Sequence, residues 1–298
     1  MTSEQLIYRE AIMQITQKNS RKMLPPLIPL AVMALSAIGC ASQENQPVHV
    51  QSQTNTNPAD IKPAQPVDHF APPAPMVEQY ALDRLKQMSD NIAAAKAFTY
   101  HATSFAEMPA PTGQFLTITV VSEVALKRPN KLRVNVWGDV PAFDVYFDGD
   151  KVSTFDPKKK LHSVSKKSVT TLDEMLDMVT SDPEINFPSA DFMYSNPYAV
   201  MTKGLTHAIV VGESMVDGVP CEHFAYMEPT INWEIWIEKG KNALPLRLAM
   251  TYKQAQNFPR FMIEYKDWHL NPKFTADTFV LNTPTDSKEI EFTTRSKK

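Results

Sequence analysis

The sequence has little of what several common protein classes require. Its 298 residues include only two cysteines, Cys40 and Cys221, and only eight glycines. The longest apolar stretch, residues 23–38, is shorter than the ~20 residues of a membrane-spanning helix and is interrupted by prolines. The formal net charge is only −3. These shortages argue against a disulfide-stapled domain, a polytopic membrane protein and a nucleic-acid-binding protein.

Catalytic motifs are also missing. The chain has no HExxH, no paired CxxC and no glycine-rich phosphate loop. Residues 212–216 approach a nucleophile elbow, but Val216 replaces the second glycine, so Ser214 is interpreted as an ordinary strand residue. Cys221 and His223 share a strand face without a visible third partner, which is weak evidence for catalysis. The other histidines of the folded part lie one per strand, at His101, His162, His207 and His269, and leave a zinc site as a minor alternative. We therefore expect a protein that is not an enzyme and has no catalytic residue, metal or cofactor.

The N-terminus has the layout of a secretory signal. Three cations between residues 18 and 22 precede the apolar stretch 23–38, which leads to Cys40. Residues 35–40 (LSAIGC) resemble a bacterial lipobox, although Ala37 stands where leucine is usual. The resemblance implies a signal peptide over residues 1–39, with translation starting at Met1 or Met13, and a lipid-bearing Cys40 as the mature N-terminus. An ordinary cleaved or uncleaved signal is the alternative.

The residue after the cysteine indicates the destination. In Gram-negative lipoproteins an aspartate in that position retains the protein at the inner membrane, so by resemblance Ala41 implies the outer membrane, facing the periplasm. Two or more acyl chains are needed for stable anchoring, and a lipoprotein cysteine would carry three. Residues 1–39 hold four of the 30 cations and two of the 33 anions, so the remainder carries a net charge of −5.

Residues 40–75 are predicted to form a disordered, proline-rich tether. They consist mainly of Gln, Asn, Pro, Ala and Thr and have hardly any aromatic or branched aliphatic clusters. Such a segment cannot bury enough apolar area to offset the entropy of ordering it. A coil of this length spans roughly 30 Å. The tether would let an anchored domain act at some distance from the bilayer.

Residues 76–292 are predicted to fold as one mainly β (α+β) domain, followed by a polar tail over 293–298. Apolar spacings of three and four predict one helix over 76–97. Alternating segments and turn residues then predict antiparallel strands over 115–127, 132–137, 143–147, 151–155, 206–215, 221–227, 232–238, 246–252 and 260–268, with a further hairpin turning at 156–158. The simplest architecture is an unclosed, curved antiparallel sheet with helices packed on its concave face.

Residues 170–204 interrupt the strands. Thr171 and Glu174 have the spacing of a capping box, so a short helix is expected there, followed by helical turns that form a lid. This insertion is rich in large apolar side chains: Met175, Met178, Phe192, Met193, Tyr194, Tyr198, Val200 and Met201. They either fill the core or line an adaptable cavity for an acyl chain, facing Leu132, Val134, Phe143 and Val145. The sequence does not decide which parity of each strand faces inward.

The C-terminal third contains several spaced motifs: residues 216–224 (VDGVPCEHF), 233–237 (WEIWI), 245–248 (PLRL), 267–268 (DW), 271–272 (NP), Phe274 and 277–279 (DTF). By these motifs the chain resembles, over residues 80–292, a family of predicted periplasmic proteins of unknown function. The alternation in 233–237 and the Asp217-Gly218 turn mark these motifs first as determinants of the fold. The family is similar, more distantly, to the LolA and LolB lipoprotein carriers and the mycobacterial LppX and LprG lipoproteins. This similarity implies an open half-barrel whose helices cover a space for acyl chains.

Three functions remain open at this stage. The first is a lipid-anchored envelope protein that binds a lipid or a lipoprotein acyl chain as a carrier or acceptor. The second is a protein-interaction or envelope-stress sensor module on the same fold, which a sealed core with an outer apolar patch would favour. The third is an envelope hydrolase, which a cluster of Cys221, His223 and a carboxylate would favour.

Overall fold

The computed structural model describes residues 75–180 and 190–292, which form one large sheet and a few helices. The strands are β1 (Met76–Val77), β2 (Ala97–Pro109), β3 (Phe115–Lys127), β4 (Lys131–Gly138), β5 (Phe143–Phe147), β6 (Val152–Asp156), β7 (Leu161–Val164), β8 (His207–Val216), β9 (Val219–Met227), β10 (Ile231–Glu238), β11 (Pro245–Tyr252), β12 (Arg260–Leu270) and β13 (Lys288–Glu289). The helices are α2 (Gln79–Ala94), α3 (Leu172–Thr180), the 3-10 helix η2 (Ala190–Met193) and α4 (Pro197–Met201).

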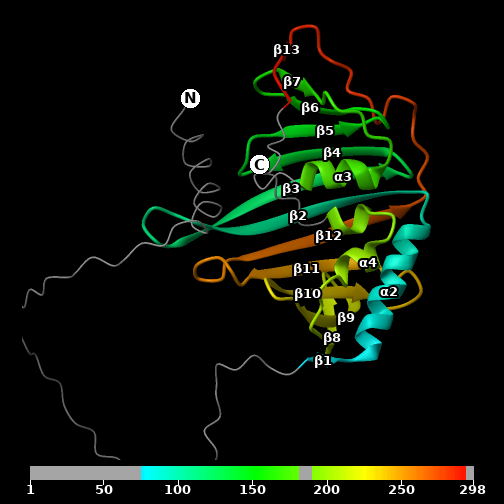
Figure 1. The fold of residues 1–298 in the computed structure, drawn as a ribbon, viewed down its shortest axis with the longest axis vertical. Coiled ribbons are helices and arrows are strands. Elements are labelled where there is room, and N and C mark those ends of the chain that lie inside the picture. Colours follow the sequence, from blue (N-terminus) through cyan, green and yellow to red (C-terminus); the bar gives the residue numbers. More distant parts are fainter. Residues whose placement is uncertain (1–74, 181–189, 293–298) are drawn as a thin grey trace, which may run out of the picture. The chain divides into compact units, whose positions relative to one another are not determined.

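The strands form a single thirteen-stranded sheet in the order β1-β8-β9-β10-β11-β12-β2-β3-β4-β5-β6-β7-β13. All neighbours are antiparallel except at the two edges, where β1 pairs with β8 and β13 with β7 in parallel. The two edges lie at opposite ends of the molecule, so the sheet is unclosed (Figure 1). Most connections are short hairpins, which is why sequence neighbours pair directly.

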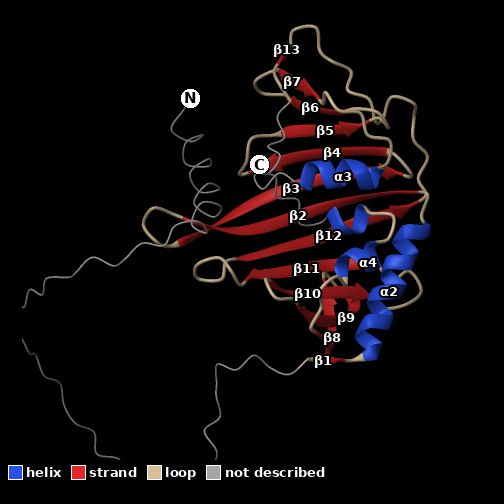
Figure 2. Cartoon of the chain, viewed as in Figure 1, coloured by secondary structure: helices blue, strands red, loops and turns tan. Residues whose placement is uncertain are grey.

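The helices α2, α3 and α4 all lie against the same face of the sheet (Figure 2). On β10 the odd positions Trp233, Ile235 and Ile237 are buried beneath them, whereas Glu234 and Trp236 lie on the other face. Helix α2 is fixed to this face by the Tyr226 hydroxyl, which donates to the carbonyl oxygen of Ala81 at 2.9 Å. The predicted architecture, an open mainly β half-barrel with helices packed on its concave face, is confirmed.

The predicted strands agree with the structure to within a residue or two. The range 115–127 is β3 and the range 143–147 is β5, without change. The turn between β8 and β9 uses Asp217 and Gly218 in the left-handed region, with φ of 49° and 79°. Thr171 and Glu174 form the expected capping box, since the Glu174 N–H donates to the Thr171 hydroxyl and the Thr171 N–H to the Glu174 carboxylate.

The helix predicted over 76–97 is wrong at both ends. Residues 76 and 77 form the edge strand β1, and the Glu78 N–H donates to the carbonyl oxygen of Ala208. At the other end, Ala95 has an extended conformation and Ala97 begins β2. The apolar spacing continues past both ends of the helix, but pairing with β8 and with β3 takes these residues into the sheet. The strand β2, which carries His101, had no predicted bounds.

Several predictions concern residues outside the described ranges. They are the signal peptide over 1–39, lipid attachment at Cys40, the tether up to residue 74, part of the insertion over 181–189, and the tail over 293–298. Within residues 75–180 and 190–292, none of the helices has the length and apolar character needed to cross a bilayer.

Candidate functional site

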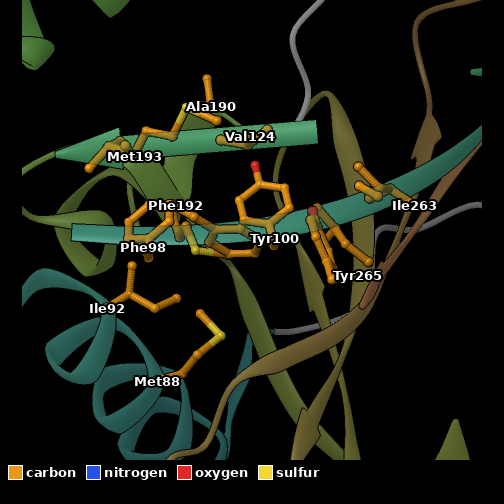
Figure 3. Close-up of a cluster of buried hydrophobic side chains, with 14 of the residues drawn as sticks. Met88, Ile92, Phe98, Tyr100, Val124, Ala190, Phe192, Met193, Ile263 and Tyr265 are labelled. Atoms are coloured by element: carbon orange, nitrogen blue, oxygen red, sulfur yellow. The ribbon is translucent and has the colours of Figure 1, made fainter. Parts of the chain in front are cut away.

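The space between the helices and the sheet is occupied by a continuous apolar core. Figure 3 shows Met88 and Ile92 of α2 pointing toward Phe98 of β2 and toward Phe192 of η2. Phe192 also meets Tyr265 of β12 edge to face, with ring centroids 5.5 Å apart. Large buried side chains therefore fill the centre of the core.

The structure brings ten of the eleven predicted ligand-binding residues into or against this core. Leu132, Val134, Met175, Phe192, Met193 and Met201 are buried members of it, and Val145, Met178, Tyr194 and Tyr198 are partly buried and pack on it. Phe143 is different, because it is 41% exposed at the start of β5 and does not belong to the core. A lining role for these residues stays a prediction, and their shared burial fits the core-filling alternative equally well.

A pocket opens where η2 and α4 lie over β10 and β11. Its volume is about 270 Å³. The lining residues are Asp191, Phe192, Val200, Met201, Lys203, Glu228, Ile231, Trp233, Leu248 and Met250. The predictions included Phe192 and Met201, and the sequence analysis also noted Val200 in the apolar insertion. The predictions did not include the pocket residues of β10 and β11, because the apolar residues of these strands were interpreted as determinants of the fold.

Two carboxyl groups stand at this pocket. Burial, reinforced by the charge of Glu228, raises the pKa of Asp191 from 3.8 to about 6. Burial also raises the pKa of Glu228, whose carboxylate accepts a hydrogen bond from Trp233 Nε1 at 3.0 Å. The pocket thus combines an apolar wall with carboxyl groups that hold their protons more strongly than in water.

A second pocket of about 290 Å³ adjoins the first, because both contain Ile231. It lies between the ends of β2, β10, β11 and β12 and is lined in part by Ala106, Met108, Tyr252 and Phe261. Both pockets lie on the concave side of the sheet, and we call the pair the concave groove.

The residues of the hydrolase alternative lie apart from this groove. His223 stacks on Trp236, with ring centroids 4.0 Å apart, and its Nε2 is 3.0 Å from a carboxylate oxygen of Glu234. Burial raises the pKa of the Cys221 thiol and lowers the pKa of His223. Both shifts favour the neutral forms, whereas nucleophilic catalysis requires a thiolate beside an imidazolium. Ser214 lies within β8, as expected of an ordinary strand residue.

Metal ligands do not gather in the part of the chain that the structure describes. No three His, Cys, Asp or Glu side chains of residues 75–180 and 190–292 are arranged so that they could hold an ion. His101, for example, has its two ring nitrogens directed to different carboxylates, those of Asp267 at 3.0 Å and Glu123 at 3.4 Å. The zinc alternative therefore has no ligand set among these residues.

The unclosed sheet, its helix-covered face and the concave groove define an open half-barrel protein. Residues 81–293 match the model of a family described as predicted periplasmic protein (DUF2092), and the chain belongs to that family. The resemblance given by the sequence motifs is thereby confirmed. No curated protein matches the chain.

Three solved structures illustrate the distant likenesses of this chain. An uncharacterized conserved protein from Thermus thermophilus is 11% identical, with a TM-score of 0.42 over 72% of this chain and 100% of that one. The lipoprotein LppX from Mycobacterium tuberculosis is 12% identical, with a TM-score of 0.36 over 67% of this chain and 100% of LppX. The LolA superfamily protein NE2245 from Nitrosomonas europaea is 10% identical, with a TM-score of 0.34 over 68% and 98%.

Proposed function

We propose that the protein binds the apolar chain of a lipid or of an acylated protein in the cell envelope, as a non-catalytic carrier or acceptor. The observation that carries this proposal is the concave groove. Its two pockets meet at Ile231, and its walls are mainly apolar side chains of the sheet and of the helical insertion. A linear chain is the ligand that fits a narrow apolar groove of this kind.

The size and lining of the groove agree with a flexible ligand. Each pocket alone, at about 270 and 290 Å³, is slightly smaller than the ~300–1,000 Å³ typical of ligand sites. A chain that extends across Ile231 would use both. Met201 and Met250 contribute unbranched side chains that adapt to different ligand shapes.

The N-terminal segment completes the proposal. Lipid attachment at Cys40 would tether the domain to the outer membrane, where it faces the periplasm, and the linker 40–75 would give it reach. The lipobox-like residues 35–40 and the family's description as periplasmic support this location. The proposed partners are thus a lipid or acylated ligand, the membrane through the N-terminal acyl chains, and an envelope protein that delivers or receives the ligand.

Native mass spectrometry of residues 75–298, which contain the buried core but not the acylated Cys40, tests the proposal after secretion into a periplasm and purification without detergent. We expect a co-purifying lipid at one per protein. Met250→Glu places a charge in the groove and is expected to remove the lipid. Met215→Glu is the matched control, because Met215 is 63% exposed on β8 and does not line the groove. Bare wild-type protein, or lipid retained by Met250→Glu, would contradict the proposal.

The second candidate is a protein-interaction module, which exposed apolar side chains at the β8 edge favour. These are Met76, Val77, Tyr80, Val211 and Met215, each at least half exposed. They lie on β1, β8 and the first turn of α2. Crosslinking in envelope extracts distinguishes the candidates: a specific protein adduct lost in Val211→Glu, from a protein that carries no lipid, would favour the interaction module.

A further inference from the structure

A separate and larger pocket lies where the C-terminal end of α2, the start of β2 and the β3–β4 turn meet the segment after β12. Its volume is about 930 Å³. The lining residues are Ala94, Lys96, Ala97, Lys127, Arg128, Pro129, Asn271, Pro272, Lys273 and Phe274. Four of these ten residues are cations and none is an acid, and we call this the basic pocket.

The four cations form no ion pair with an acidic side chain of the described residues. None of the ion pairs found in residues 75–180 and 190–292 includes Lys96, Lys127, Arg128 or Lys273. Elsewhere in the same domain surface lysines are paired, as Lys266 is with Asp217 at 2.5 Å. The whole chain has a net charge of −3, so this local excess of positive charge is an exception. A concave site lined by one sign of charge attracts a ligand of the other sign.

Hydrogen bonds between three chain segments hold the basic pocket in place. The Lys96 N–H donates to Asn271 Oδ1 at 2.8 Å, and the Asn271 N–H donates to the carbonyl oxygen of Ala97 at 2.7 Å. The Arg128 N–H donates to the carbonyl oxygen of Lys96 at 2.8 Å. The backbone on which the cations stand is therefore fixed before any ligand arrives.

Arg128 links this pocket to the core. Its Nη1 donates to the carbonyl oxygen of Met193 at 2.9 Å, and its guanidinium lies 6.0 Å from the centroid of the Phe98 ring. Its Nε and Nη2 are buried and have no hydrogen-bond partner in the described structure. Because these two atoms are shielded from solvent, Arg128 contributes positive charge behind the pocket wall rather than a donor at its surface.

We propose that the basic pocket binds the anionic group, a phosphate or a carboxylate, of an amphiphilic ligand. The apolar side chains beside the cations, Ala94, Ala97 and Phe274 among them, contact the start of the ligand's chain. This assignment rests on the proposed function in one respect, namely that the anion is attached to an apolar chain. The anion site itself follows from the four cations that line the pocket.

Isothermal titration calorimetry of the chain carrying Cys40→Ser, to which no acyl chain can be attached at residue 40, tests the assignment. The probes are decyl phosphate, inorganic phosphate and neutral decyl maltoside, each below its micelle concentration. We expect decyl phosphate to bind at least tenfold more tightly than either other probe. The double variant Lys127→Glu/Lys273→Glu is expected to lose at least tenfold in that affinity. Both lysines are exposed, so their reversal leaves the core intact.

The matched control is Lys158→Glu/Lys241→Glu, which changes the net charge equally at exposed sites outside the basic pocket. It should bind decyl phosphate like the wild type. Equal binding of decyl phosphate by the pocket and control variants would overturn the anion site, and tight binding of decyl maltoside would then leave the proposed function standing. If inorganic phosphate binds as tightly as decyl phosphate, and only the pocket variant loses this binding, the anion site stands. Its link to an apolar chain would then be overturned.

Discussion

At the scale of single residues, burial separates two apolar side chains that the sequence treats alike. Leu132 and Phe143 were both assigned to the lining of a cavity, but Leu132 is 1% exposed and Phe143 is 41% exposed. We predict that Leu132→Ala lowers the free energy of unfolding by about 2–5 kcal/mol, because it leaves a void in the core. Phe143→Ala should lower the free energy of unfolding by clearly less than Leu132→Ala does. Urea denaturation measures both, and equal losses would contradict the assignment of Phe143 to the surface.

Asp191, at the groove, makes the free energy of unfolding depend on pH. Its carboxyl has a pKa of about 6 in the folded protein and 3.8 when exposed, so between these pH values the folded state binds the proton more strongly. The free energy of unfolding should therefore fall as the pH rises through this window, by up to about 3 kcal/mol in total. Asp191→Asn removes this component, so the difference between variant and wild type should grow from pH 4 to pH 6. A constant difference in chemical denaturation across that range would contradict the burial of Asp191.

The carboxyl groups at the groove illustrate what the sequence does not reveal. Asp191 lies in the helical insertion and Glu228 follows the last residue of β9, and only the packing of η2 against the sheet brings them into one pocket. No local pattern marks either residue. Met201, by contrast, was predicted because the insertion is rich in apolar side chains.

At the scale of elements, helix α3 depends on a local cap. The Thr171 hydroxyl accepts from the Glu174 N–H at 3.2 Å, and Asp173 accepts from the N–H of Ser195, which lies between η2 and α4, at 2.8 Å. We predict that Thr171→Ala destabilises the protein by about 1 kcal/mol, whereas Thr171→Ser keeps the cap. Thermal unfolding followed by circular dichroism compares the two. A serine variant as unstable as the alanine variant would show that the hydroxyl has no capping role.

The elements that could be predicted are those whose signals are local. Alternation and turn residues delimited β3, β5, β8 and β9, because each of these strands has one covered face and ends at a recognisable turn. The edge strands β1 and β13 have two residues each and exist only through parallel pairing with β8 and β7. No periodicity can be read from two residues. The pairing of β1 with β8 also made the predicted helix over 76–97 too long at its N-terminal end.

At the scale of the whole molecule, the sequence predicted the type of fold but not the inner face. The sequence of β4 does not show whether its odd-numbered or its even-numbered side chains face the helices. The structure shows the even-numbered Leu132 and Val134 in the core. The basic pocket was also beyond the sequence, because its lining comes from segments near residues 96, 128 and 272 that meet only in the folded sheet. The proposed function depends on the concave groove, and the inferred anion site depends on the basic pocket.

Quenching of tryptophan fluorescence by a brominated fatty acid tests the binding of an apolar chain most directly. Trp233 lines the groove, whereas Trp236, three residues along the same strand, lies on the opposite face beside His223 and Arg247. We predict saturable quenching in the wild type that persists in Trp236→Phe and is largely lost in Trp233→Phe. Quenching that survives in Trp233→Phe, or no saturable quenching in the wild type, would contradict the claim that the groove holds the ligand.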